Sequence, residues 1–311
     1  MRPLGKSLLS IWGALPVLVR APILAFVVLD VGSTCAAVPL FVNTKILTEI
    51  PWSLPLTLLL MWLFWLYAIG RGQPAATREY RARMTRRKTL AAPVWRGALL
   101  AIMVCLIATW SLRLILPSIE PVDPPHLAID VRAYPVATVI GLTLALAISA
   151  GIVEEVAFRG YLQKSLEEAY GIVPALLVTG VAFWFAHADK VTLSHLPFHV
   201  AVSILLGTVT YLTRSLLPAI IAHALGDALL LPAYVYQRPA ALWSLLSARP
   251  VFEGHATGSL GAILSAFRPA LLLEPGTHLL AVAGWVLIVS SIVAVLALRH
   301  LARVAVTAGA C

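Results

Sequence analysis

Charged residues are scarce in this sequence. Only 12% of the 311 residues are charged, whereas 60% are hydrophobic and the mean hydropathy is +0.91. A water-soluble core cannot bury that much apolar surface, so the composition excludes an ordinary soluble enzyme and indicates an integral membrane protein. The apolar stretches recur along the whole chain and leave no room for a separate soluble domain.

Cysteine is rare as well, and its placement excludes two kinds of site. Cys35 and Cys105 lie inside apolar stretches and Cys311 is the last residue. This spacing fits neither a disulfide framework nor a cysteine metal knuckle. The sequence also lacks the His-Glu-x-x-His run of many zinc proteases.

The net charge of +9 comes largely from short basic segments beside apolar stretches. The densest runs from Arg71 to Lys88, where seven arginine and lysine residues are opposed only by Glu79. By the positive-inside rule we expect this segment in the cytoplasm, in contact with lipid headgroups, and both chain termini on the same side. The charge therefore needs no nucleic-acid partner. The richness in alanine, leucine and arginine favours a bacterium, hence the bacterial inner membrane.

We expect an all-α, polytopic membrane protein of about eight transmembrane helices, with its site in a cavity of the helical bundle. Residues 1–135 would hold N-terminal spans without a recognisable motif, 136–234 a catalytic helical core, and 235–311 an external loop and the last span. Asp30 falls inside the first expected span and has no identifiable partner. Residues 8–19 are expected to form an interfacial helix, and 117–135 and 237–277 external loops. The expected spans are 21–42, 54–69, 98–112, 136–168, 172–187, 197–211, 215–234 and 279–298.

Two adjacent carboxylates, Glu154 and Glu155, fall inside one expected span. Each costs about 2.5 to 3.5 kcal/mol at mid-bilayer unless it is paired or faces a wet cavity. Arg159 follows Glu155 by four residues on the same helical face, which predicts a structural ion pair. Glu154 points about 100° away and has no such partner, so we expect it to face another group.

Helix geometry predicts that this group is His187. Glu154 precedes Tyr170 by sixteen residues, and His187 follows Gly171 by sixteen. In an antiparallel hairpin that turns there, both side chains lie about 24 Å from the turn. A carboxylate and an imidazole that meet in a cavity can deprotonate a water molecule, with Glu154 as the base and His187 as the orienting partner. A charge cluster at a helix end and a helix-capping histidine are the alternatives.

His223 and Asp227 are again four residues apart on one helical face. We expect Asp227 to accept the ring N–H of His223, so that the other nitrogen faces an oxyanion or binds a metal; a structural hydrogen bond between helices is the alternative. His195 and His199 have metal-ligand spacing, but Pro197 interrupts it. We therefore expect no metal, and zinc is the weaker alternative. Its ligands would be Glu154, His187, His223 and Asp227.

Three motifs occur in order on hydrophobic helices: Glu-Glu-Val-Ala-Phe-Arg at 154–159, Phe-Trp-Phe-Ala-His at 183–187 and His-Ala-Leu-Gly-Asp at 223–227. Together they resemble the CAAX-protease and bacteriocin-processing (CPBP, Abi) family, which includes the type II CAAX prenyl endopeptidases. The resemblance covers about residues 136–234. It implies an intramembrane glutamic endopeptidase in which Glu154 and His187 activate water. His223 would stabilise the oxyanion together with Asp227, where the family has asparagine or aspartate.

This resemblance implies a peptide or protein substrate at the lipid bilayer, cleaved near its terminus. A non-catalytic bacteriocin-immunity or scaffold protein is the main alternative, since the related bacterial proteins are also linked to self-immunity. A transporter would also bury charges. The intact Glu154, His187 and His223 favour the enzyme over the scaffold, and the sequence lacks the inverted repeat of many transporters.

Overall fold

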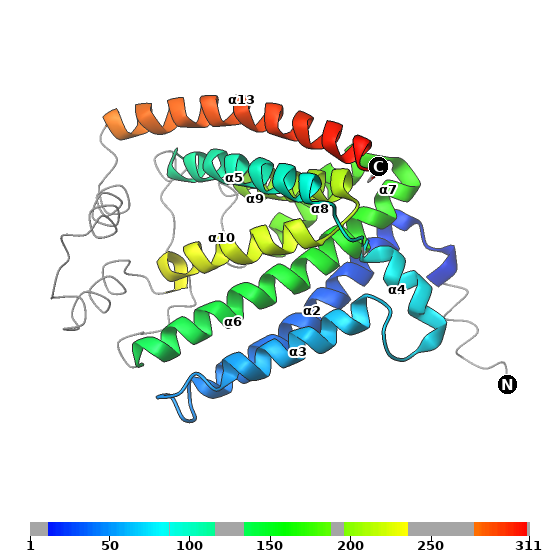
Figure 1. Ribbon diagram of the computed structural model, residues 1–311. Helices are drawn as coiled ribbons and strands as arrows, with labels where there is room; N and C mark the ends of the chain where they lie inside the picture. Colours follow the sequence, from blue (N-terminus) through cyan, green and yellow to red (C-terminus); the bar gives the residue numbers. More distant parts are fainter. Residues whose placement is uncertain (1–11, 87, 116–133, 188–195, 236–276, 310–311) are drawn as a thin grey trace.

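The computed structural model describes residues 12–86, 88–115, 134–187, 196–235 and 277–309. All regular structure within these ranges is helical (Figure 1), which confirms the all-α class. A short 3-10 turn, η1 (Ala75–Thr77), and a π-helix, η4 (Glu155–Gln163), interrupt the α-helices. The α-helices are α2 (Val17–Asn43), α3 (Ser53–Ala68), α4 (Arg78–Met84), α5 (Ala92–Ile115), α6 (Val136–Glu154), α7 (Lys164–Tyr170), α8 (Ile172–Phe185), α9 (Leu196–Thr213), α10 (Leu217–Val235) and α13 (Thr277–Thr307).

Several helices are long and apolar enough to cross a membrane, which makes this a multi-pass membrane protein. Three more apolar helical stretches, Ser53–Ala68, Ile172–Phe185 and Leu217–Ala228, are shorter over the residues whose side chains are described, and they fall in the expected spans 54–69, 172–187 and 215–234. The full count of eight spans therefore stays a prediction. The expected loops 117–135 and 237–277 lie almost entirely outside the described residues, as do residues 8–11 of the interfacial segment 8–19. The described part of that segment has a helical turn at 12–14 and then the start of α2 at Val17, so it is not one separate helix. The five long stretches are Val17–Asn43, Ala92–Thr109, Val136–Tyr170, Leu196–Thr213 and Val282–Thr307.

Among the described residues, the two largest of four apolar cores meet at α10, where Ile220 packs against the first and Ala219 belongs to the second. In Figure 1, α2, α3 and α6 lie side by side, and α13 runs along α5 on the opposite side of the bundle. The first core gathers around Phe158 and Leu162 of η4 and includes Leu216. The second lies between α5, α9 and α13 and includes Ala222 of α10. The helix that carries His223 and Asp227 is thus fixed between both cores.

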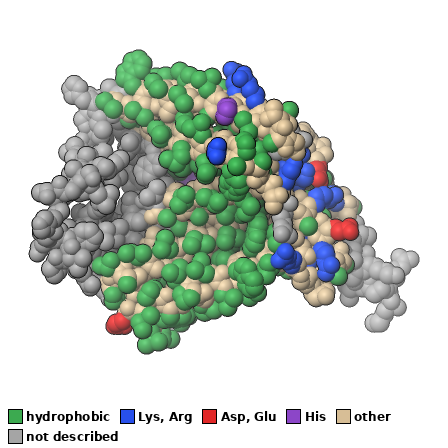
Figure 2. Space-filling model, viewed as in Figure 1, with side chains coloured by type: hydrophobic (Ala, Val, Ile, Leu, Met, Phe, Trp, Pro, Cys, Tyr) green, Lys and Arg blue, Asp and Glu red, His purple; other side chains and the backbone are tan. Residues whose placement is uncertain are grey.

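The surface separates into an apolar belt and a charged end. Figure 2 shows hydrophobic side chains over the long helices, with lysine, arginine and acidic side chains gathered near α4 and α7. Exposed valine, isoleucine and tryptophan side chains cover α2 and α13, as expected for helices that contact lipid. Asp30 is exposed on α2, and nothing in the structure explains it.

Two of the basic residues in the arginine-rich segment turn inward, which differs from the expected contact with lipid headgroups. Arg81 is only 2% exposed; it donates to the carbonyls of Gly72 and Pro74, each at 3.1 Å, and its guanidinium lies 4.1 Å from the ring centre of Tyr67. Arg86 is buried in an ion pair with Glu167 of α7. These contacts satisfy carbonyls left without partners at the turn and fix α4 against the bundle.

Candidate active site

The site begins where α6 changes into the π-helix η4. Glu154 is the last residue of α6 and Glu155 the first of η4, whose nine residues are all buried. In a π-helix each N–H bonds five residues back, which widens the helix; such turns are uncommon and are frequent at functional sites. The sequence carried no signal for this change, because the expected span 136–168 has an ordinary apolar composition. The helix is nevertheless continuous from α6 through η4 to α7, as expected for the span 136–168.

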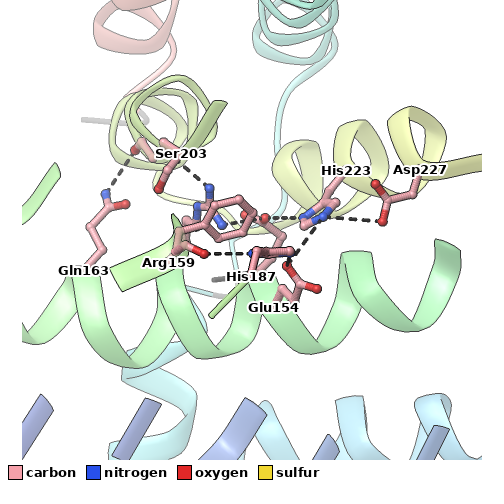
Figure 3. A network of polar contacts seen from close by, with 10 residues as sticks. Glu154, Arg159, Gln163, His187, Ser203, His223 and Asp227 are labelled. Carbon is pink, nitrogen blue, oxygen red and sulfur yellow. Dashed lines mark hydrogen bonds and ion pairs between the residues drawn. The ribbon is translucent and has the colours of Figure 1, made fainter. Parts of the chain in front are cut away.

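Helix α10 approaches α6 closely next to the adjacent carboxylates of Glu154 and Glu155. A Cβ atom added to Gly151 would lie 2.9 Å from the backbone carbonyl oxygen of Ile220 and from the Cβ of Ala224. No real side chain fits there, so glycine is required for this contact. The close approach places His223 over the end of α6 (Figure 3).

Glu155, Arg159 and His223 form a buried network. Nη1 of Arg159 lies 2.9 Å from Oε1 of Glu155, and both side chains are 0% exposed. Nδ1 of His223 lies 2.7 Å from the same oxygen. The guanidinium also lies 4.7 Å from the ring centre of Phe183, and its Nη2 is 3.5 Å from the carbonyl oxygen of Ser203. The spacing predicted the Glu155–Arg159 pair, whereas nothing in the sequence indicated that Glu155 also holds His223.

Asp227 does not occupy the position expected for it. Its Oδ2 lies 3.6 Å from Nε2 of His223, beyond normal hydrogen-bond length. The other ring nitrogen, Nδ1, is taken by Glu155. The expected bond, in which Asp227 accepts the ring N–H and leaves the other nitrogen free for an oxyanion, is therefore not formed. Asp227 instead lies on the Nε2 side of the ring, where the packing of α10 on α6 also places Oε2 of Glu154, 3.7 Å from the same nitrogen.

His187 and Glu154 meet across the hairpin as the residue spacing predicts. The turn lies at Gly171, whose φ of +83° is a conformation that favours glycine. Nε2 of His187 then lies 3.9 Å from Oε2 of Glu154. Nδ1 of His187 lies 2.8 Å from the carbonyl oxygen of Phe183, which can only accept a hydrogen bond. This contact puts the ring proton of a neutral His187 on Nδ1 and directs the Nε2 lone pair at Glu154.

The imidazoles of His187 and His223 both line a small cavity of about 120 Å³. Its polar lining consists of Thr109, His187, His199, His223 and Asp227, and the rest is mostly apolar side chains of α5, α8 and α9. The ring centres of His199 and His187 are 5.0 Å apart. From the sequence, His199 was assessed only as a possible metal ligand together with His195, which lies outside the described residues. The position of His199 in this cavity was not predicted.

The geometry gives zinc little support. Among the described residues, no three or more histidine, cysteine, aspartate or glutamate side chains are placed to hold one metal ion. The bonds of the Nδ1 atoms of His187 and His223 to protein groups do not decide the matter, because a metal-bound histidine commonly has its second ring nitrogen bonded in this way. The oxygen of Glu154 that faces both histidines is buried and has no hydrogen-bond partner in the described chain. The arrangement therefore suits acid–base chemistry on a water molecule.

Buried carboxylates and histidines in contact with one another among apolar helices are typical of membrane proteins that have a functional site inside the helical bundle. Residues 136–229 match the family model described as type II CAAX prenyl endopeptidase Rce1-like, which confirms the resemblance seen in the motifs. The match covers less than a third of the chain and includes the residues of the candidate site, from Glu154 to Asp227. This is a protease family, which supports a membrane protease. Comparisons with curated proteins and with solved structures returned no match.

Proposed function

We propose that this protein is an intramembrane endopeptidase of the glutamic type, which hydrolyses a peptide bond near the terminus of a membrane-associated peptide or protein. One observation carries the proposal: Oε2 of Glu154 is buried without a hydrogen-bond partner in the described chain and faces two imidazoles. It lies 3.9 Å from Nε2 of His187 and 3.7 Å from Nε2 of His223.

The gap between Glu154 and His187 suits one water molecule. A separation of 3.9 Å is too long for a direct hydrogen bond, and contacts of this length are commonly bridged by water. The Glu154 carboxylate and the Nε2 lone pair of His187 are both acceptors, so a bridging water would donate one hydrogen to each. Its oxygen lone pairs then remain free to attack a carbonyl carbon, and Glu154 takes the proton that the water loses.

His223 is suited to stabilise the oxyanion that this attack creates. Its Nδ1–H donates to Glu155, so Nε2 needs a second proton in order to donate to the oxyanion. Three carboxylates and one arginine surround the ring, and a protonated Nε2 would offset part of their net negative charge. Glu154 then returns its proton to the leaving nitrogen as the carbon–nitrogen bond breaks. Asp227, 3.6 Å from Nε2, supports this nitrogen electrostatically in place of the expected hydrogen bond.

The test is a comparison of membrane proteomes. A bacterial strain that lacks the protein is complemented with the wild-type chain or with Glu154→Gln, which removes the base but keeps the size of the side chain. We expect a membrane protein whose terminus is trimmed only with the wild-type chain. Equal trimming by both chains at equal expression would contradict the mechanism. A phenotype rescued equally by both chains would favour the immunity or scaffold function instead.

A further inference from the structure

A second cavity lies at the charged end of the bundle, between α2, α4 and α7. Its volume is about 370 Å³, and it shares no lining residue with the cavity of the candidate active site. Val17, Ala21 and Leu24 of α2 form an apolar wall. The facing wall is polar, with Tyr80 and Arg83 from α4 and groups from α7. A ligand that fits both walls has a polar and an apolar part.

The polar wall has an excess of positive charge. Arg20 and Arg83 both line the cavity, and Glu168 is its one acidic lining residue among those described. The Glu168 carboxylate lies 3.9 Å from Nε of Arg83 and 3.3 Å from Nζ of Lys164. No described acidic side chain pairs with Arg20. An arginine in a cavity with no protein counter-ion is well placed to bind an anion.

Two hydroxyl groups complete this wall. Tyr80 and Ser165 both line the cavity with their hydroxyl groups. Burial raises the pKa of the Tyr80 phenol, so the hydroxyl stays protonated and is able to donate. Arginine and hydroxyl donors together match the oxygens of a phosphate group.

The cavity also borders the surface that contacts lipid. The same turns of α2 that form its apolar wall carry the exposed side chains of Leu18, Val19 and Ile23. Trp12, which also lines the cavity, is 36% exposed, and tryptophan is enriched where the membrane meets water. In Figure 2 the charged side chains gather at this end, next to the apolar belt. The cavity therefore lies at the level where lipid headgroups would contact the protein.

We propose that this cavity binds one anionic phospholipid, with its phosphate at Arg20 and Arg83 and the start of an acyl chain along Val17, Ala21 and Leu24. Phosphate oxygens accept from the two guanidinium groups and from the hydroxyls. The anionic headgroup neutralises the positive charge of Arg20 and Arg83 that Glu168 alone does not neutralise. The site is separate from the proposed hydrolytic chemistry and does not depend on it.

The test uses the purified full-length chain in micelles that contain phosphatidylglycerol and phosphatidylcholine, with bound lipid measured by native mass spectrometry. Arg20→Gln combined with Arg83→Gln removes both phosphate contacts. The matched control combines Arg71→Gln with Arg78→Gln, which are exposed near the same helix, do not line the cavity and change the net charge equally. We expect about tenfold weaker phosphatidylglycerol binding than in the control.

A second variant separates the binding from the stability of the fold. Ala169 is exposed and lines the cavity, so Ala169→Trp should fill it without altering charge and should also displace the lipid. Each variant is first shown to unfold at the wild-type temperature. Equal lipid binding by the cavity variants and the control, or equal retention of phosphatidylcholine, would overturn the proposal. Binding of inorganic phosphate with no phosphatidylglycerol retained would also overturn it, because the occupant would then be free phosphate.

Discussion

Glu155→Gln tests the buried network most directly, because it removes one charge and almost no volume. The 2.9 Å pair between Glu155 and Arg159 is 0% exposed on both sides. Removal of one partner leaves the guanidinium charged and uncompensated inside the protein, which is worth about 3 to 5 kcal/mol. We therefore expect the variant to lose about 3 kcal/mol of unfolding free energy, or about a hundredfold in the ratio of folded to unfolded protein.

A double variant distinguishes a lost charge pair from a general loss of packing. Arg159→Met alone should destabilise by a similar amount, because it leaves the Glu155 carboxylate without its cation. Glu155→Gln combined with Arg159→Met removes both charges, and replacement of a whole buried pair by uncharged groups is often neutral. The double variant should therefore be more stable than either single variant, although His223 loses the carboxylate that orients it and activity stays low.

The assay is unfolding of the purified chain in a mild detergent, followed by the fraction that stays monodisperse as temperature or denaturant rises. Glu154→Gln serves as the control, because Glu154 is not part of this ion pair. Two results would refute the reasoning. One is a single variant that is as stable as the parent. The other is a double variant whose loss of unfolding free energy equals the sum of the losses in the two single variants.

Three further predictions concern the chemistry and the topology. Glu154→Gln should lower turnover by at least about a hundredfold without loss of folded protein, because an amide cannot take a proton from water; wild-type turnover would exclude Glu154 as the base. Asp227→Asn should keep activity within about tenfold and be insensitive to chelators, because in the proposed site the Asp227 carboxylate does not bind a metal. An inactive Asp227→Asn that added zinc rescues, in a preparation with stoichiometric metal, would reverse this. A reporter fused near Arg83 should be cytoplasmic and one near Glu49, between α2 and α3, external; the opposite result would place the site at the other membrane face.

Much of the helical organisation could be predicted because it depends on simple periodicity. The apolar stretches predicted the helices. The equal spacing of Glu154 and His187 on either side of Tyr170 and Gly171 predicted the hairpin. The exact number of spans, the orientation and the division at 135 and 234 stay predictions. Three apolar helical stretches, Ser53–Ala68, Ile172–Phe185 and Leu217–Ala228, are too short over the described residues to count as spans by length and composition.

The partners of single polar atoms could not be predicted in the same way. Spacing within one helix indicates which side chains share a face, and this gave the Glu155–Arg159 pair. The contact of His223 with Glu155 joins residues 68 positions apart and depends on how α10 packs on α6. The same packing leaves Asp227 on the other side of the ring, and the π-helix depends on packing that no composition reveals.

The close spacing of Glu155 and Arg159 also matters for biosynthesis. Their helix is made and inserted into the membrane before the segment that contains His223, because synthesis proceeds from the N-terminus. Two opposite charges four residues apart can neutralise each other within a single nascent helix, before any other helix is available. The salt bridge of the folded site would thus also ease the passage of its own segment through the insertion machinery, whereas Glu154 must wait for its partners to arrive.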